Sequence, residues 1–156
     1  MRLALSFILL LAATLHAQTR PDEDLLDAAR SGDRARVLAL LDNAPRSGLS
    51  VNTANKYGVS ALGFAAERGH FDIVRLLVER GADVNVVDTF YGSRPIDFAL
   101  RGGHLNIAVY LLEHKSPGAV SVLNAAIRRS DAAAVNVALA TKQADAAALA
   151  IGLVLE

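Results

Sequence analysis

The feature that most constrains the fold of this chain is a segment that occurs twice, 34 residues apart. Glycines, small residues and large apolar residues all recur downstream at this one offset. The matched pairs are Gly58 with Gly92, Leu62 with Ile96, Phe64 with Phe98, Ala65 with Ala99, Gly69 with Gly103, His70 with His104, Ile73 with Ile107 and Leu77 with Leu111. Self-similarity at a period of about 20 to 50 residues predicts a repeat protein, in which each unit buries its apolar face only against its neighbours.

Each copy carries a helical pattern of apolar residues. The large apolar residues of segment 73–78 stand at positions i, i+1, i+4 and i+5, and segment 107–112 repeats this stripe. Such spacing places the apolar side chains on one face of a helix. The small residues Ala65, Ala66 and Ala99 precede these stripes and would let paired helices approach closely.

Several residues predict where helices begin and end. Asp33 and Asp131 stand just before helical stripes and are suited to cap the free N–H groups of a first turn. Gly81 stands where a left-handed residue ends a helix, and its counterpart in the next copy is Lys115. A lysine in that conformation is strained by about 1 kcal/mol. We therefore expect the loop at 116–118 to follow a different path.

The segment from Asn55 to Asp88, NKYGVSALGFAAERGHFDIVRLLVERGADVNVVD, resembles the ankyrin repeat. The Gly-Ala-Asp-Val-Asn stretch at Gly81–Asn85 keeps the family pattern. The Thr-Pro-Leu-His motif of the family is degraded to Ser-Ala-Leu-Gly at Ser60–Gly63 and to Arg-Pro-Ile-Asp at Arg94–Asp97. The resemblance implies an all-α, ankyrin-type helical repeat solenoid of paired antiparallel helices with extended turns between repeats.

Four repeats and a final helix are expected along the chain. The resemblance places the repeats at approximately 21–54, 55–88, 89–118 and 119–141, and a capping helix follows at 143–155. About four extra residues are expected around Pro45–Leu49. The last segment is apolar on most sides, whereas the end of a solenoid normally needs a polar face. Three interpretations stay open: a poorly covered cap, an apolar helix that self-associates or packs on another protein, or a sequence cut short inside a fifth repeat.

The first 17 residues resemble a secretory signal peptide. They contain one early arginine, an apolar run from Leu3 to Leu15 and a small residue, Ala17, at the expected cleavage point. Cleavage there leaves a repeat domain at 18–156 and predicts a periplasmic or secreted protein. The alternative is an uncleaved membrane anchor, although the run is short for a span of about 20 residues. The chain contains no cysteine, so packing alone must stabilise it.

We found no sequence motif for catalysis, phosphate binding or nucleotide binding, so no enzyme activity, cofactor or metal site is expected. The family resemblance assigns His70 and His104 a structural role, in which the histidine closes the turn between two helices by hydrogen bonding to backbone. The acidic run Asp22–Asp24 has the composition of a carboxylate site, but at a helix start it more simply complements the helix dipole. The formal net charge is +0, which gives no reason to expect nucleic acid as a partner.

Two sets of residues are candidates for binding a protein partner. Tyr57, Phe90 and Tyr91 fall in the expected turns between repeats, together with Arg94 at the start of the next helix. Exposed aromatic residues are typical binding anchors, and the alternative is that they tuck against a neighbouring turn. A second set is a row of arginines near the ends of the first helices of the repeats, Arg30, Arg68, Arg101 and Arg128. This row predicts an acidic partner and salt-sensitive binding, and the alternative is an ordinary solvated face.

The resemblance implies a non-catalytic module, exported across a membrane, that binds a protein partner through its concave face. A narrower hypothesis is an inhibitor or immunity-type protein. The alternative function is an envelope scaffold, or a membrane-anchored protein that keeps its N-terminal segment.

Overall fold

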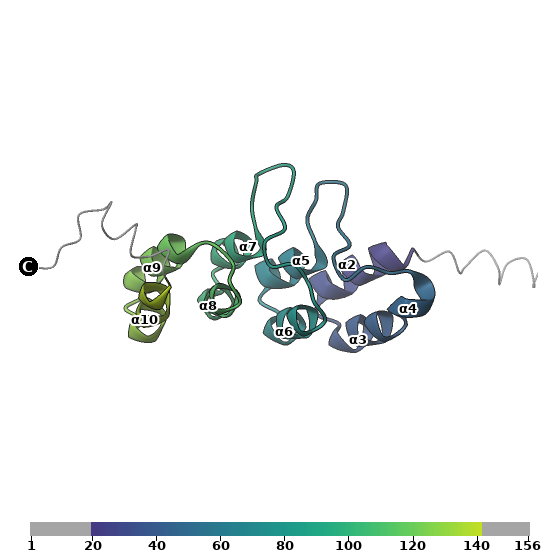
Figure 1. The fold of residues 1–156 in the computed structure, drawn as a ribbon, viewed down its shortest axis with the longest axis horizontal. Coiled ribbons are helices and arrows are strands. Elements are labelled where there is room, and N and C mark those ends of the chain that lie inside the picture. The colour runs from purple at the N-terminus through teal and green to yellow at the C-terminus, as the bar shows by residue number, and fades with distance from the viewer. Residues whose placement is uncertain (1–19, 142–156) are drawn as a thin grey trace, which may run out of the picture.

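The computed structural model describes residues 20–141, which form a stack of antiparallel helix pairs (Figure 1). The helices are α2 (Pro21–Ser31), α3 (Arg34–Asp42), α4 (Ala44–Ser47), α5 (Ala61–Arg68), α6 (Phe71–Glu79), α7 (Pro95–Gly102), α8 (Leu105–Glu113), α9 (Ala119–Arg128) and α10 (Ala132–Ala140). The expected all-α architecture of paired helices is confirmed for this part of the chain. The expected signal peptide at 1–17 and capping helix at 143–155 lie outside the described residues.

The helices form two parallel rows. Helices α2, α5, α7 and α9 follow one another in an inner row, and α3, α6, α8 and α10 form an outer row (Figure 1). A continuous apolar core runs between the rows, with Leu25, Leu62 and Ile96 buried at matching places in the first three inner helices. Ala65 and Ala99 are fully buried where α5 contacts its neighbours. These small side chains lie where inner helices of neighbouring pairs pack against one another.

The helix boundaries follow from local capping. The carboxylate of Asp33 accepts a hydrogen bond from the backbone N–H of Arg36 at 2.9 Å, and that of Asp131 accepts one from Ala134 at 3.0 Å. Both predicted N-caps are therefore confirmed. The extra residues around Pro45–Leu49 include the short helix α4, which prolongs the connection after α3.

Lys115 takes the same left-handed conformation as Gly81, the residue with which it aligns. The φ angles are 68° at Lys115 and 85° at Gly81. The loop that follows Lys115 then departs from the pattern of the preceding repeat, as expected. Ser116 is buried, and its hydroxyl donates to the carbonyl of Val84 at 3.2 Å. The chain enters α9 directly after Gly118, so no long loop projects there.

Two long loops project side by side from the edge of the inner row (Figure 1). We call them the first loop (residues 49–60) and the second loop (residues 81–94). The backbone N–H of Thr89 donates to the carbonyl of Tyr57 at 2.8 Å, which ties the second loop to the first. Nearer the helices, the side-chain oxygen of Asn52 accepts a hydrogen bond from the N–H of Asp83 at 2.7 Å. These two bonds hold the loops together as one wall.

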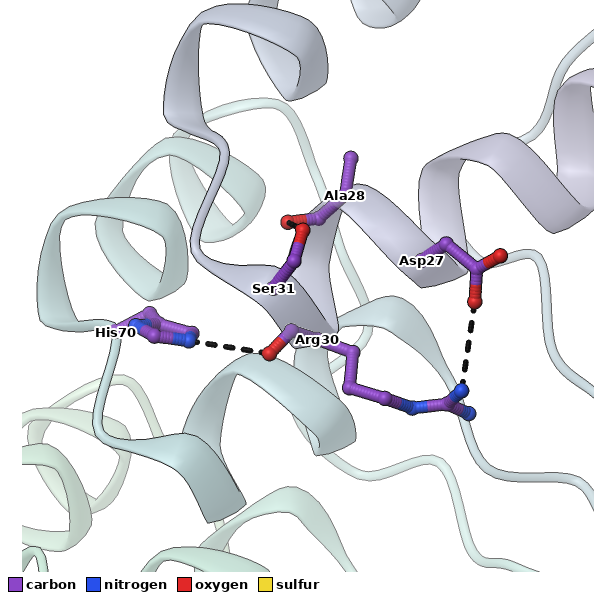
Figure 2. A network of polar contacts seen from close by, with 5 residues as sticks. All are labelled: Asp27, Ala28, Arg30, Ser31 and His70. Atoms are coloured by element: carbon purple, nitrogen blue, oxygen red, sulfur yellow. Dashed lines mark hydrogen bonds and ion pairs between the residues drawn. The ribbon is translucent and has the colours of Figure 1, made fainter.

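Histidines join neighbouring helix pairs. Nε2 of His70, at the start of α6, lies 3.2 Å from the carbonyl oxygen of Arg30 in α2, and because a carbonyl only accepts, the imidazole donates (Figure 2). The bond to backbone agrees with the expected structural role. It reaches the preceding helix pair, however, rather than closing the turn within its own pair. The ring of His104 lies close to Gly69 of the preceding pair, as that of His70 lies close to Gly32.

Candidate partner-binding groove

The inner helices and the two loops enclose an open groove of about 410 Å³. Its floor comes from the ends of α2, α5 and α7, and its wall comes from the two loops. This volume falls in the range of about 300–1,000 Å³ that is typical of ligand sites. The lining residues are Arg30, Asn55, Tyr57, Val59, Phe64, Glu67, Asp88, Phe90, Tyr91, Phe98 and Arg101.

Three aromatic side chains from the two loops stand together at the mouth of this groove. Tyr57 is 47% exposed, Phe90 66% and Tyr91 71%. The rings of Tyr57 and Phe90 lie edge to face with centroids 6.2 Å apart, and those of Phe90 and Tyr91 lie 4.5 Å apart. These residues, which we call the aromatic cluster, contact one another across the two loops and still keep much of their area in water. The rings therefore pack against a neighbouring turn, and they also remain exposed as binding anchors do.

Asp88 holds the second loop in the shape that presents Phe90 and Tyr91. Its Oδ1 accepts hydrogen bonds from the N–H groups of Phe90 at 2.8 Å and Tyr91 at 2.6 Å, and its Oδ2 accepts one from Ser93 at 2.8 Å. Burial by itself raises the pKa of Asp88, but these three hydrogen bonds and the nearby charge of Arg101 outweigh burial and lower the pKa overall. The carboxylate of Asp88 is therefore ionised at neutral pH, and its role is to hold the backbone of the second loop.

The first loop contains a neutral counterpart of this device. The side-chain oxygen of Asn55 accepts hydrogen bonds from the N–H groups of Tyr57 at 2.9 Å and Val59 at 3.0 Å. Asn and Asp side chains characteristically order turns by bonding to backbone two residues on. Both loops thus set their aromatic residues by the same local chemistry.

Two arginines of the predicted row lie in the groove, each stacked on a phenyl ring. The guanidinium carbon of Arg30 lies 4.1 Å from the centroid of Phe64. That of Arg101 lies 4.9 Å from the centroid of Phe98 and 5.4 Å from that of Tyr91. Arg101 also donates to the hydroxyl of Ser93 at 2.9 Å. Cation–π stacking orders both guanidinium groups on the floor of the groove.

The charged residue that lines the groove between these two arginines is acidic. Glu67, and not Arg68, lines the groove between Arg30 and Arg101. Arg68 is exposed one residue further along α5 and lies outside the groove lining. Adjacent residues on a helix point about 100° apart, so an alignment that tolerates one position does not keep side chains on one face. Of the arginine row, Arg30 and Arg101 therefore line the groove, Arg68 is exposed outside it, and the charge between the two arginines in the lining is that of Glu67.

The remaining predicted site residues lie elsewhere. The backbone N–H of Arg94, at the start of α7, donates to the carboxylate of Asp97 at 2.9 Å, and its side chain does not line the groove. Arg128 lines a separate hollow between α7 and α9. Of the seven predicted residues, the structure brings together Tyr57, Phe90, Tyr91 and Arg101, but not Arg68, Arg94 or Arg128.

Sequence reasoning missed six groove residues, although some signals were present. Phe64 and Phe98 occupy equivalent positions in the two central copies, which is a signal for a shared face. Asn55 and Asp88 each stand two residues before an aromatic residue, which is a turn signal. Nothing local in the sequence marks Val59 or Glu67, because the packing of the helices and loops decides what faces the groove.

The acidic run at the start of α2 is used structurally. Asp24 forms an ion pair with Arg36 of α3. Asp22 accepts a hydrogen bond from the hydroxyl of Thr53 at 3.0 Å. Both contacts tie α2 to its surroundings, in keeping with a structural role at a helix start. Within residues 20–141, no group of three or more His, Cys, Asp or Glu side chains is arranged to hold a metal ion.

None of the helices described between residues 20 and 141 is long and apolar enough to cross a membrane.

Comparison with known families identifies the repeat. Residues 25–124 match the family described as ankyrin repeats, in three copies. The chain belongs to the ankyrin repeat family. The three copies cover the helices from α2 to α8 and end within α9. Members of this family serve as protein interaction modules, and the concave groove described above lies within the matched region.

Similar proteins carry the same repeats in different settings. The chain is 40% identical over 92 residues to the probable E3 ubiquitin-protein ligase XBOS33 of Oryza sativa subsp. japonica, a match of 58% of this chain and 17% of that protein. It is 38% identical over 76 residues to the B-cell lymphoma 3 protein homolog of Mus musculus, covering 49% of this chain and 17% of that protein. These matches span less than a fifth of either relative, so they concern the repeats alone.

One relative consists mostly of the matched region. The Notch-regulated ankyrin repeat-containing protein of Xenopus tropicalis is 31% identical over 86 residues, which is 55% of this chain and 75% of that protein.

Proposed function

We propose that this ankyrin repeat protein is an exported, non-catalytic module that binds a protein partner through the groove and its aromatic cluster. The single observation that carries the proposal is the exposure of the aromatic cluster, with Tyr57, Phe90 and Tyr91 between 47% and 71% exposed at the mouth of a groove. Large rings left in water on an ordered surface are the residue type that dominates binding energy at protein interfaces.

Pre-organisation favours this role. The cluster sits on loops whose backbones are held by Asn55 and Asp88, and the two loops are bonded to each other between Thr89 and Tyr57. A partner that docks here loses little free energy in ordering the loops, because they are already held in place. An aromatic side chain also has few rotatable bonds, which limits the entropy lost when it is buried.

The same proposal includes a cellular location outside the cytoplasmic membrane and a fourth ankyrin repeat. The pattern of residues 1–17 supports export to the periplasm or the medium after cleavage behind Ala17. Helices α9 and α10 repeat the paired arrangement of the preceding units and support a fourth repeat at the end of the matched region. An inhibitor or immunity-type role is a narrower form of the same hypothesis, since both act by covering a partner.

The experiment is a pull-down from extracts of the source cells, with the chain and a triple variant Tyr57→Ala, Phe90→Ala and Tyr91→Ala as baits. We expect the variant to lose the partner, identified by mass spectrometry. Arg75→Ala is the matched control, because Arg75 is an exposed residue of α6 outside the groove. Undiminished capture by the triple variant would place the binding surface elsewhere.

Export has its own measurement. Intact mass of the protein recovered from cell fractions should correspond to residues 18–156. A species that retains residues 1–17 in a membrane fraction would contradict export with cleavage and favour the anchored alternative.

A further inference from the structure

We propose that the groove recognises an extended peptide segment of alternating charge, in which a Lys or Arg side chain faces Glu67 and an Asp or Glu on each side reaches Arg30 and Arg101. This inference rests on the proposed function, because it specifies what part of a partner enters the groove. It also revises the expectation of a simply acidic partner. The charges that line the groove are mixed, and their order along the inner helices is positive, negative, positive.

Glu67 is the carboxylate that is available to a ligand. It lines the groove half-buried and forms no ion pair with any residue between 20 and 141. The second carboxylate of the lining, Asp88, already accepts three backbone hydrogen bonds. A cation placed over Glu67 would also meet aromatic ring faces within the same lining, which attract positive charge. An incoming ammonium or guanidinium group would therefore form an ion pair with Glu67 at the centre of the groove.

The two flanking arginines are ordered but weakly neutralised. Arg101 donates to a neutral hydroxyl, that of Ser93. Asp88 lies near enough for their charges to interact, but among the described residues no carboxylate is within ion-pair distance of Arg101, and the oxygens of Asp88 already accept backbone hydrogen bonds. Arg30 pairs with Asp27 at 3.4 Å (Figure 2), and the two side chains are 43% and 69% exposed. An exposed pair of this kind contributes little free energy, so it does not prevent Arg30 from meeting a second carboxylate. Acidic side chains therefore match both ends of the groove.

The spacing of the helices that carry these charges matches the repeat of one extended peptide conformation. Glu67 comes from α5, and Arg30 and Arg101 come from the adjacent inner helices α2 and α7. Packed helices lie about 8–10 Å apart. A polyproline II segment rises about 3.1 Å per residue with three residues per turn, so every third side chain points the same way at intervals of about 9 Å. The complementary order is acid-x-x-base-x-x-acid.

Aromatic side chains favour the same conformation. Proline-rich polyproline II segments dock in grooves lined by aromatic residues, because their backbone is already extended and their rings pack on ring faces. The aromatic cluster provides this kind of wall beside the charged row. We therefore place proline or other apolar residues at the x positions of the bound segment.

The test uses two synthetic peptides and the full chain. The first peptide is acetyl-Asp-Pro-Pro-Lys-Pro-Pro-Asp-amide, and the second has every charge reversed. Titrations followed by nuclear magnetic resonance give affinities even in the millimolar range and show which groove amides shift. We expect the first peptide to bind at least about tenfold more tightly than the reversed one. Equal binding of the two peptides, or no binding of either at millimolar concentration, would overturn the inference.

Charge-swap variants connect the preference to Glu67. Glu67→Gln should weaken the first peptide by about tenfold, and Glu67→Lys should favour a third peptide with Asp at all three charged positions. Arg68→Gln is the matched control, since it neutralises the adjacent charged side chain outside the groove and should leave all affinities unchanged. Melting temperatures establish that each variant folds. An unchanged peptide preference in a folded Glu67→Lys variant would also overturn the inference.

This test is separable from that of the proposed function. If the triple aromatic variant loses its partner while the peptides fail to discriminate, the groove binds a protein but the charge order proposed here is wrong. If the triple variant keeps its partner, the proposed function fails directly.

Discussion

Nε2 of His70 donates a hydrogen bond to the backbone carbonyl of Arg30, 3.2 Å away in the preceding helix pair. The same arginine extends its side chain over Phe64 on the floor of the groove. One residue therefore belongs both to the contact that joins two repeats and to the surface proposed for binding. Gly32, two residues later, lets the imidazole approach the chain closely enough for this bond, since a Cβ there would lie 2.7 Å from Cε1 of His70.

Gly32→Ala should destabilise the protein more than Gly81→Ala. Both glycines have left-handed backbones, with φ of 84° and 85°, so each substitution strains the backbone by about 1–2 kcal/mol. Only at Gly32 does the new methyl also clash with His70, because nothing lies within 4 Å of a Cβ at Gly81. We expect Gly32→Ala to lower the free energy of unfolding by about 1–3 kcal/mol more than Gly81→Ala does, as measured by chemical denaturation. Equal losses at the two positions would mean that the imidazole moves aside freely.

His70→Ala should lower the free energy of unfolding by about 1–3 kcal/mol, because it removes a hydrogen bond between repeats and leaves the Arg30 carbonyl without this donor. His70→Gln provides the comparison, since its amide can donate to the same carbonyl. Denaturation curves of both variants measure the effect. If the glutamine variant is no more stable than the alanine variant, packing of the ring and not its hydrogen bond is the important contribution.

Lys115→Gly should raise the melting temperature. Lys115 has a φ of 68°, a conformation that glycine adopts without strain and that Gly81 holds at the equivalent place. The expected gain is up to about 1 kcal/mol, or roughly 2–4 °C. Arg80→Gly is the contrasting variant, because Arg80 has a φ of −91° and gains nothing from glycine. A melting temperature that does not rise in Lys115→Gly would contradict strain at this residue.

Asp88 should make the second loop sensitive to acid. Folding lowers the pKa of Asp88 below its ordinary value of 3.8, so its contribution to stability is complete at neutral pH and is lost as the pH falls below about 4 through the lowered pKa. The loss should appear in the backbone amide signals of Phe90, Tyr91 and Ser93 during an acid titration. Amides that lose their native shifts with a midpoint at or above pH 3.8 would contradict a lowered pKa of Asp88.

The Asp88→Asn variant distinguishes the contribution of Asp88 to the pH dependence of stability from that of the other carboxylates. An asparagine oxygen can replace Oδ1 opposite Phe90 and Tyr91, but its amide nitrogen then faces the N–H of Ser93 as a second donor. We expect a loss of about 1–3 kcal/mol at pH 7 and a flatter dependence of stability on pH between about 5 and 3. The converse change, Asn55→Asp, should be milder because one side-chain oxygen already accepts both hydrogen bonds there. The measurement is thermal melting of the three proteins across that pH range.

The sequence by itself determined the repeat, the helix pairs and their caps. These follow from local rules: apolar residues at helical spacing, Asp at N-caps, and glycine where φ is positive. The alignment with Gly81 marked Lys115 as a residue that a left-handed conformation would strain, and only the structure showed that it takes that conformation. The turns that carry Tyr57, Phe90 and Tyr91 were also recognisable, since the offset of the repeat defines where the turns lie.

Only the tertiary structure decided which charges face the groove and which contacts hold it. A shift of one residue turns a side chain by about 100° around a helix, so packing of the inner helices brings Glu67 to the groove and leaves Arg68 outside it. The bond between His70 and Arg30 and the burial of Asp88 likewise depend on segments that meet only when the repeats stack. Local sequence patterns specify elements, whereas the order of charges on a surface depends on how those elements are rotated against one another.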